Sequence, residues 1–464
     1  MDEIEEIIRA DRPTADIIND LKDKQTDVPE WSDTVKDYDP ARHKIVEDKQ
    51  GRRDKIKSNG EVETASRIHL GLEQLITKRT AEFTFAIPVE RTYYNIDDKQ
   101  DIRRAVEAIY KHAHIDTENI HRCTAYYAAC EIFTVWYVTK KPNTLYGFPS
   151  KYKLKCKTYS PMDGTKLYPL FDKMGDMIAM SLEYSHKKKG KETTYFETYT
   201  ASMHYFWKNA GKDGWETVSA TRNALGKIPG VYISRQKPVF ASITHLREEI
   251  EYTLSRNSDV LAYNASPVLK VAGQIQGSED KGESRRIFRV ENNGDVSYVS
   301  WAQSIESLRY HVDTMLKLIF MQAQMPDLSF ESMKSLGDIG YDARQMALSD
   351  AHLKIGDESG VLLEFLEREY NVVKEFVKLM RPDWAADIED MEVEHTITPY
   401  IQNDESLQID RLQKANGGKA ILSQLDSIRM AGYSNDPEST LEQIKAEDGA
   451  AEEQRMGNMF EGAV

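Results

Sequence analysis

The sequence SITHLREEIEYTLSRNSDVLAY at residues 242–263, together with SIESLRYHVDTMLKLIFMQAQM at residues 304–325, decides the fold of this chain. Both stretches have the periodicity of a helix, and each gathers its apolar residues into one narrow stripe. The stripe residues are Ile243, Leu246, Ile250, Leu254 and Leu261 in the first stretch, and Ile305, Leu308, Val312, Met315, Leu316 and Ile319 in the second. A helix with so narrow a stripe buries only one side, so we expect these helices to pack against copies of themselves.

The residues around these two stretches predict a mixture of helices and strands. Between them, residues 264–303 predict a small α/β insert: an extended segment at 264–272, a polar loop at 273–282, and short strands at 287–290 and 296–301. Before them, the pattern predicts helices at 64–80, 98–113 and 117–129, extended segments at 83–89 and 132–138, a β-rich region at 152–215, and a strand at 228–234. The fold class is therefore α+β.

After the second one-sided helix, Pro326 ends the helical pattern and a segment punctuated by Gly337 and Gly340 follows. The pattern then predicts a helix, a longer helix at 359–380 with a wide apolar face, and a strand at 392–398. The remaining residues are helical in pattern and strongly acidic.

The charge of the chain argues against a protein that wraps nucleic acid. Its 61 lysines and arginines stand against 76 aspartates and glutamates, a net charge of −15. Such a protein repels phosphate on average and can contact DNA only locally. Three cysteines are too few for a disulfide framework, and the N-terminus does not resemble a signal peptide. We therefore expect a soluble intracellular protein.

No motif indicates an enzyme. The patterns G-x-x-x-x-G-K-[ST], G-x-S-x-G and H-E-x-x-H and the dinucleotide-binding glycine fingerprint are absent. The histidines and cysteines between His112 and Cys130 lack the paired spacing of a zinc site. The carboxylates between Asp383 and Glu394 could hold magnesium in a nuclease, but a sequential acidic run is more often a solvated face. We expect no catalysis, no cofactor and no metal, with a metal-dependent nucleic-acid enzyme as an alternative.

Several motifs, in this order, resemble the portal proteins of tailed bacteriophages of the long-tailed siphophage type. They are the helix-to-strand stretch that starts at Ala65, GKIPGVYI at 226–233, YNASPVLKVAG at 263–273, Met325-Pro326-Asp327 followed by Gly340 to Met346, and Asp436-Pro437-Glu438. One departure concerns residues 340–344, which read GYDAR where family members often carry S-G-x-A-L-[KR].

The resemblance implies the portal-protein fold and a division of the chain. The expected parts are a charged N-terminal arm (1–60), the wing (61–241), stem helix 1 (242–263), the clip (264–303), stem helix 2 (304–325), the tunnel loop (326–340), a second part of the wing (341–402), and a helical acidic crown (403–464).

The resemblance also implies a function and a set of partners. A portal is a ring, normally of about twelve copies, at one capsid vertex of the virion, where double-stranded DNA enters during packaging and leaves during ejection. Its partners are the terminase large subunit, a head–tail adaptor, the major capsid protein and scaffold; it is assembled in the host cytoplasm, with no membrane involved. Another head or adaptor assembly protein is a further alternative.

Three groups of residues follow as candidates for these roles. The tunnel loop against DNA would use Asp327, Glu331, Lys334, Gly337, Asp338 and Gly340, with Lys334 as the local DNA contact. Carboxylates of stem helix 1 facing the channel would be Glu248, Glu251 and Asp259. Packing between subunits would use Ile243, Leu246, Ile250, Leu254, Ile305, Leu308, Val312, Met315 and Ile319.

Overall fold

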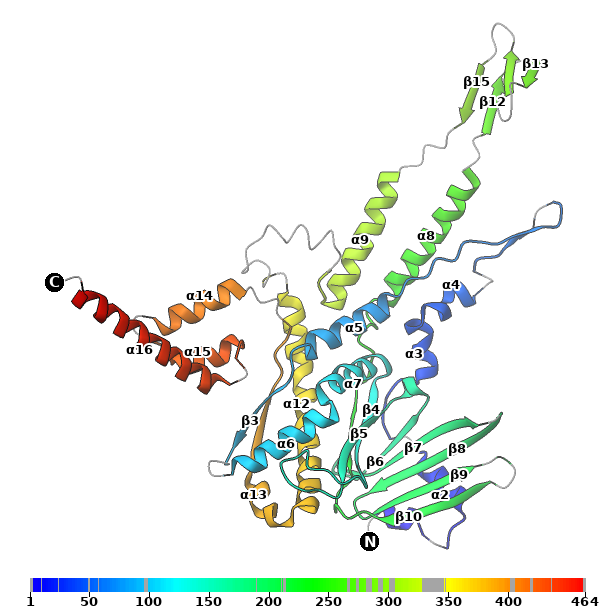
Figure 1. The fold of residues 1–464 in the computed structure, drawn as a ribbon. Helices are drawn as coiled ribbons and strands as arrows, with labels where there is room; N and C mark the ends of the chain where they lie inside the picture. The colour runs from blue at the N-terminus through cyan, green and yellow to red at the C-terminus, as the bar shows by residue number, and fades with distance from the viewer. Residues whose placement is uncertain are drawn as a thin grey trace. The chain divides into compact units, whose positions relative to one another are not determined.

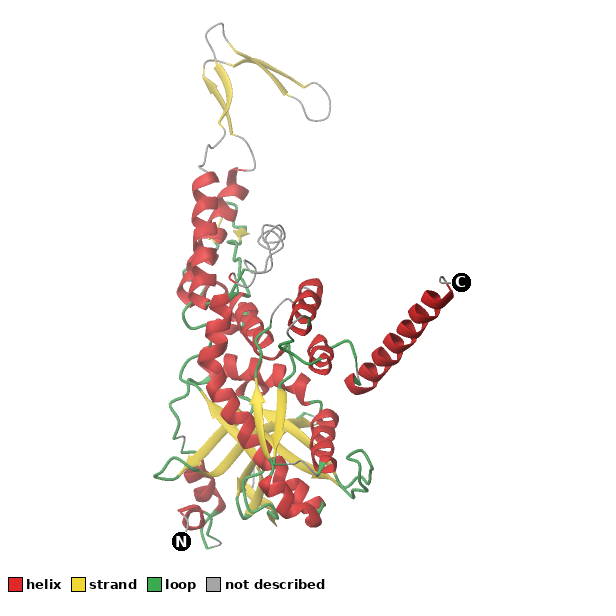
Figure 2. Ribbon diagram, turned by 90° about the vertical axis from the view of Figure 1, so that its left-hand side faces the viewer, coloured by secondary structure: helices red, strands yellow, loops and turns green. Residues whose placement is uncertain are grey.

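The computed structural model describes residues 3–461 apart from residues 10, 24, 49–50, 57, 96–98, 189, 210, 212–213, 265–267, 273–274, 281–285, 291–294, 300–304, 328–345, 347, 401–404, 418–419 and 435. The chain divides into two compact units. The larger consists of Met1–Asp338 and Met346–Tyr400, and the smaller contains Ile401–Val464. Both helices and strands build the fold, which confirms the α+β class (Figure 2).

An antiparallel five-stranded sheet forms one layer of the larger unit (Figure 1). Its strands are β6 (Lys166–Phe171), β7 (Met177–Lys188), β8 (Lys191–Thr200), β9 (Met203–Asn209) and β10 (Trp215–Arg222). Short connections join consecutive strands, so neighbours in sequence are neighbours in the sheet. Helices α1 (Glu3–Ile7) and α2 (Thr14–Leu21) pack their apolar residues against Phe196 and Trp207 of this sheet. The start of the predicted arm therefore belongs to the core of its own chain.

A three-stranded sheet in the order β11-β4-β5 forms the centre of the larger unit. Its strands are β4 (Glu131–Thr139), β5 (Lys153–Tyr159) and β11 (Gly230–Ser234). Gly230 is required where β11 meets β4, because a Cβ atom there would lie 2.6 Å from both the Phe133 ring and the Thr134 carbonyl oxygen. This close approach explains the glycine in the GKIPGVYI motif.

Four helices pack around this central sheet: α5 (Leu72–Phe85), α6 (Gln100–Ala113), α7 (Ile115–Ala129) and α12 (Ser349–Met380). The wide apolar face of α12, which includes Phe365, Val373 and Val377, is buried in the same core. Strand β3 (Glu90–Tyr94) pairs with β16 (Glu392–Thr396), the strand that follows α13 (Ala385–Asp390). This pairing joins residues of the larger unit that are some 300 positions apart in the chain.

The two one-sided helices are α8 (Thr244–Asn264) and α9 (Ile305–Ala323), and they lie side by side and antiparallel (Figures 1 and 2). Between them come β12 (Val268–Ala272), β13 (Ile275–Asp280), β14 (Arg286–Val290) and β15 (Asp295–Val299). Strand β12 pairs with β15 and β13 with β14, both antiparallel. The side chain of Ile305 lies outside the described residues.

Part of the apolar stripes faces the interior of the same chain, which corrects the prediction of packing between copies for Ile243, Ile250 and Ile319. Ile243, Ile250 and Ile319 are at most 1% exposed and belong to the main core. Leu246, Leu254 and Met315 pack against that core as partly buried residues. Because the helices are antiparallel neighbours, each stripe covers the other. Leu308 and Val312 remain half-buried.

Several of the predicted elements differ from the structure. Residues 64–71 are extended and the helix begins only at Leu72, so it continues to Phe85 and the strand starts at Glu90 rather than at 83. The predicted polar loop at 273–282 contains β13. The two helices expected before Met380 are one continuous helix, α12, which runs through Gly356 and Gly360 because helical glycine costs only about 1 kcal/mol.

The remaining elements are short or lie in the smaller unit. The N-terminal segment also contains α3 (Trp31–Tyr38), a 3₁₀ turn at Pro40–Arg42, α4 (Lys44–Glu47), and the hairpin of β1 (Lys55–Ile56) and β2 (Val62–Glu63). Further 3₁₀ turns are Pro161–Asp163 and Pro382–Trp384. The smaller unit consists of α14 (Glu405–Asn416), α15 (Gln424–Ala431) and α16 (Pro437–Glu461). Among the described helices, none combines the length and the apolar character needed to cross a membrane.

Candidate functional site

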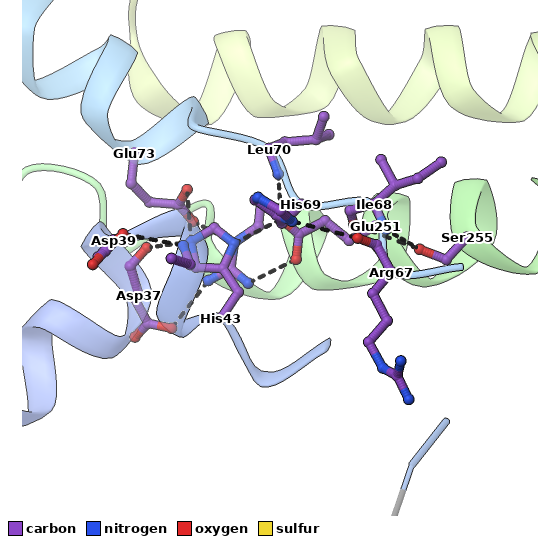
Figure 3. Close-up of polar contacts among 12 residues, drawn as sticks. Asp37, Asp39, His43, Arg67, Ile68, His69, Leu70, Glu73, Glu251 and Ser255 are labelled. Atoms are coloured by element: carbon purple, nitrogen blue, oxygen red, sulfur yellow. Dashed lines mark hydrogen bonds and ion pairs between the residues drawn. The ribbon is translucent and has the colours of Figure 1, made fainter. Parts of the chain in front are cut away.

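A buried cluster of charged side chains joins α8 to the N-terminal segment and to α5 (Figure 3). Arg247 and Glu251 lie one turn apart on α8, Glu73 comes from the first turn of α5, and His43 comes from the turn before α4. All four side chains are fully buried. Burial of so many charges is costly unless each one is paired, so their contacts decide what the cluster does.

Arg247 contacts three carboxylates at once. Its Nε donates to Glu73 Oε1 at 2.6 Å, its Nη1 to Glu251 Oε2 at 3.2 Å, and its Nη2 to Asp37 Oδ1 at 3.0 Å. Burial raises the pKa of Glu73, and the charge of Arg247 opposes that rise. The planar guanidinium, which stays protonated in proteins, therefore holds three separate segments together at this point.

His43 lies between two hydrogen-bond acceptors. Its Nδ1 is 2.7 Å from Glu251 Oε1, and its Nε2 is 2.8 Å from the backbone carbonyl oxygen of Asp37. Glu251 also accepts hydrogen bonds from Arg247 and from the Leu70 amide, as an ionised carboxylate does. A carbonyl oxygen and an ionised carboxylate only accept hydrogen bonds, so acceptors lie on both sides of the His43 ring.

Residues 64–71, here called the strap, run along α8 in an extended conformation. The amides of Ser66, Ile68 and Leu70 donate to Asp259 Oδ1 (2.8 Å), Ser255 Oγ (2.8 Å) and Glu251 Oε1 (2.7 Å). Two extended residues advance about 6.6 Å and four helical residues about 6.0 Å, so every second strap amide meets every fourth α8 side chain. The strap and α8 therefore match in spacing over three successive contacts.

Removal of the central acceptor tests this match. We expect Ser255→Ala to destabilise the protein by about 1 kcal/mol, because the Ile68 amide loses its acceptor. Hydrogen exchange of the strap amides, measured by mass spectrometry, should accelerate several-fold while exchange in α12 stays unchanged. Ser258→Ala is the control, since this serine lies on the same helix and its hydroxyl has no hydrogen bond with a described residue. Equal exchange in both variants would contradict a role of Ser255 in holding the strap.

The structure corrects the prediction that Glu251 faces a channel, whereas for Asp259 it remains a prediction. Glu251 is fully buried by Arg247, His43 and the strap. Asp259 pairs with Arg52 and accepts from Ser66. Although partial burial opposes it, the hydrogen bonds from Ser66 and the charge of Arg52 lower the pKa of Asp259. Glu248 is half-buried and lies beside a groove described below.

The other predicted residues divide into those that the structure describes and those that it does not. Asp327 is half-buried, whereas Glu331, Lys334, Gly337, Asp338 and Gly340 lie outside the described residues. The acidic run at 383–394 is distributed among separate partners: Asp383 pairs with Arg381, Asp387 with Lys99, and Glu389 with Lys378. Among the described residues, no group of histidines, cysteines and carboxylates is arranged to hold a metal ion.

Sequence reasoning missed the cluster and the strap. His43, Glu73 and Arg247 are far apart in the chain, so no local pattern connects them. The strap was predicted as helix because Ile68 is in phase with Leu72 and Ile76. The one available signal was the glutamate and arginine within the stem helix, four residues apart, which indicated a pair on one face.

The comparisons with known proteins assign a family. The sequence profile of the family described as "Phage portal protein, SPP1 Gp6-like" matches residues 20–454. No sequence among the curated proteins matches. Among solved structures, a chain of the "Neck of empty GTA particle computed with C6 symmetry" has a TM-score of 0.41 and 9% identity, with 86% of this chain and 95% of that chain covered. A chain of the "Virion of native gene transfer agent (GTA) particle" has a TM-score of 0.36 and 10% identity, with 88% and 94% covered.

These structural likenesses are too weak to carry an argument, so the assignment rests on the family profile, which spans most of the chain. The profile agrees with the family that the motif order indicates. Its description names phage portal proteins. This chain belongs to the SPP1 Gp6-like family of phage portal proteins.

Proposed function

We propose that this portal protein forms a closed ring of about twelve copies at one capsid vertex, and that double-stranded DNA passes through its centre during packaging and ejection. The terminase large subunit docks on the ring during packaging and a head–tail adaptor replaces it afterwards. The major capsid protein and scaffold contact the ring while the head assembles in the host cytoplasm. The family match over residues 20–454 is the observation that carries this proposal.

The geometry of the stem supports this function. Helices α8 and α9 form an antiparallel pair that brackets the strands β12–β15, an arrangement that suits the stem and clip of a portal. The strap and the buried cluster attach this pair to α3, α4 and α5, so force applied to the stem reaches the rest of the larger unit. The proposed parts of the chain, from arm to crown, keep the boundaries expected from the sequence.

The net charge of −15 suits a channel through which DNA slides. A wall of like charge repels phosphate and keeps the duplex from binding tightly. Residues 326–340 remain the proposed tunnel loop, with Lys334 as the local DNA contact and Gly337 and Gly340 as the points where it bends. Its grip on DNA is weak because Asp327, Glu331 and Asp338 offset the lysine.

Purified protein should form a ring. We expect light scattering to give a particle many times the 53.2 kDa chain mass, and negative-stain images to show a ring with a central hole. The experiment is repeated with the scaffold protein, since scaffold can be needed for assembly. A monodisperse monomer at micromolar concentration under both conditions would contradict the proposal.

The alternatives predict different observations. A head or adaptor protein of another type would lack the helix–clip–helix insertion, which the order of α8, β12–β15 and α9 provides here. A metal-dependent nucleic-acid enzyme would cut DNA with magnesium, and Asp387→Asn or Glu389→Gln would abolish that activity. We propose instead that the protein has no catalytic activity, because its acidic run is paired with lysines and arginine rather than convergent.

A further inference from the structure

Each stem helix carries a second stripe that faces away from its partner helix. On α8 this outer stripe consists of His245, Glu249, Tyr252 and Arg256, all of which are exposed. On α9 the outer stripe consists of Glu306, Tyr310, Asp313, Lys317 and Met321, also exposed. Tyr310 is 75% exposed and Met321 63%, which is unusual for large side chains on a packed helix.

The two outer stripes are two different surfaces of the helix pair. A helix turns about 100° per residue, so positions spaced by three and four residues share one side. Ile250 and Leu254 of α8 and Met315 and Ile319 of α9 turn toward the core that both helices share, and the strap covers a third side of α8. The outer stripes are the sides that remain. Two different surfaces of one subunit are what a heterologous contact in a closed ring requires.

The heights of the two stripes along the helix pair also match. Ser242 Oγ donates to the Gln322 carbonyl oxygen at 3.3 Å, which places these two residues level with each other. From that contact, Glu249 lies seven residues along α8 and Lys317 lies five residues back along α9, so their heights differ by two residues, or about 3 Å. The same count brings Tyr252 level with Tyr310 and Arg256 level with Glu306, again to about 3 Å. Rotation about a ring axis parallel to the helices keeps these heights.

The charges at equal height are opposite. Glu249 would meet Lys317, and Arg256 would meet Glu306, with the two tyrosines between these pairs. None of these four charged side chains has an ion pair with a described residue of its own chain. In contrast, Asp313 already has Arg309 as a partner at 3.7 Å. The unpaired charges therefore alternate in a pattern that a second copy can neutralise.

A groove beside the α8 outer stripe has room for side chains from a neighbour. Its volume is about 420 Å³, and it lies between α8 and the segment that contains α4. Glu248 and Glu249 line it, together with Lys44, Arg52 and the His245 ring. Lys317 of a second copy would reach this groove at the height of Glu249.

We propose that the α8 outer stripe of one copy docks against the α9 outer stripe of the next copy in the ring, through Glu249 with Lys317, Tyr252 with Tyr310, and Arg256 with Glu306. This inference rests on the ring of the proposed function and specifies its stem interface. The partner is a second copy of this chain, because both surfaces and their complementary charges are on the same subunit.

Charge reversal tests the pairing. Glu249→Lys and Lys317→Glu, made singly, each place like charges together at every stem interface, so we expect half-assembly to need about a tenfold higher protein concentration. The double variant, Glu249→Lys with Lys317→Glu, restores opposite charges and should return assembly to the wild-type concentration. Native mass spectrometry and light scattering measure the ring fraction, and thermal melting followed by circular dichroism confirms that each variant is folded.

The matched control is Lys78→Glu, on α5, whose side chain is 70% exposed and which should assemble like wild type. Normal assembly of both single reversals would overturn this interface while the ring itself stands. Failure of the double variant to recover would overturn the pairing of Glu249 with Lys317. A wild-type protein that forms no ring, with or without scaffold, would instead overturn the proposed function.

Discussion

Replacement of Arg247 by alanine is expected to lower the free energy of unfolding by about 3–5 kcal/mol, because it leaves the buried carboxylates of Glu73 and Glu251 without their shared cation. The substitution also removes the contact to Asp37, so α3 loses its attachment to α8. Equilibrium unfolding in urea measures the stability. Limited trypsin digestion should cut the segment that contains Arg52 and Arg67 sooner than in wild type.

Arg222→Ala is the control for this prediction, because Arg222 is exposed at the end of β10 and belongs to none of the proposed contacts. A second variant separates charge from packing: Arg247→Met combined with Glu73→Gln and Glu251→Gln removes the buried ionic charges of three residues while similar volumes remain. We expect this triple variant to be more stable than Arg247→Ala. If Arg247→Ala and Arg222→Ala unfold at the same urea concentration, the cluster does not stabilise the larger unit.

The second large effect is expected at Glu369, on the buried face of α12. Arg122 donates to both Glu369 oxygens, at 2.6 Å and 2.8 Å, and Trp136 Nε1 donates to Oε1 at 2.9 Å. All three side chains are buried. Glu369→Leu leaves a guanidinium with no counter-charge in the centre of the core, so we expect a loss of about 3–5 kcal/mol. Differential scanning calorimetry and the shift in tryptophan fluorescence on unfolding measure it.

Glu364→Leu is the matched control for Glu369→Leu. Glu364 lies on the same helix, its side chain is 58% exposed, and its ion pair with Arg368 is on the surface. Exposed pairs of this kind contribute at most about 1 kcal/mol. A similar melting temperature for the two leucine variants would show that the buried pair does not hold α7, β4 and α12 together.

Local periodicity was sufficient for most of the secondary structure. Helix α6 was expected from Ile102, Val106 and Ile109, and strand β4 from its run of β-branched and aromatic residues; both are present. The predicted start of α5 was wrong, because one apolar residue in phase with the helix lies outside it. Ile68 continued the phase of α5, but its amide bonds to Ser255 instead, and the helix starts four residues later. Hydrogen bonds to a distant helix are invisible to a local pattern.

The candidate site shows the same division. The sequence predicted one-sided stem helices, and the structure has them, but the roles given to Glu251 and to the buried stripe residues Ile243, Ile250 and Ile319 were wrong. An apolar stripe shows which side of a helix is buried, and a run of charged residues shows which side can face water. Neither pattern indicates whether the residues that bury the apolar side belong to the same chain or to another copy.

By itself, the sequence determined the α+β class, the pair of one-sided helices around a small insert, and the portal family, because these depend on the order and spacing of residues along the chain. Only the tertiary structure decided that the stripes of α8 and α9 face their own core, that Glu251 is buried, and that the strap follows α8. The physical reason is that Arg247 balances the charge of Glu73 from a position 174 residues away. Such pairing depends on where the folded backbone places two side chains, which no local repeat encodes.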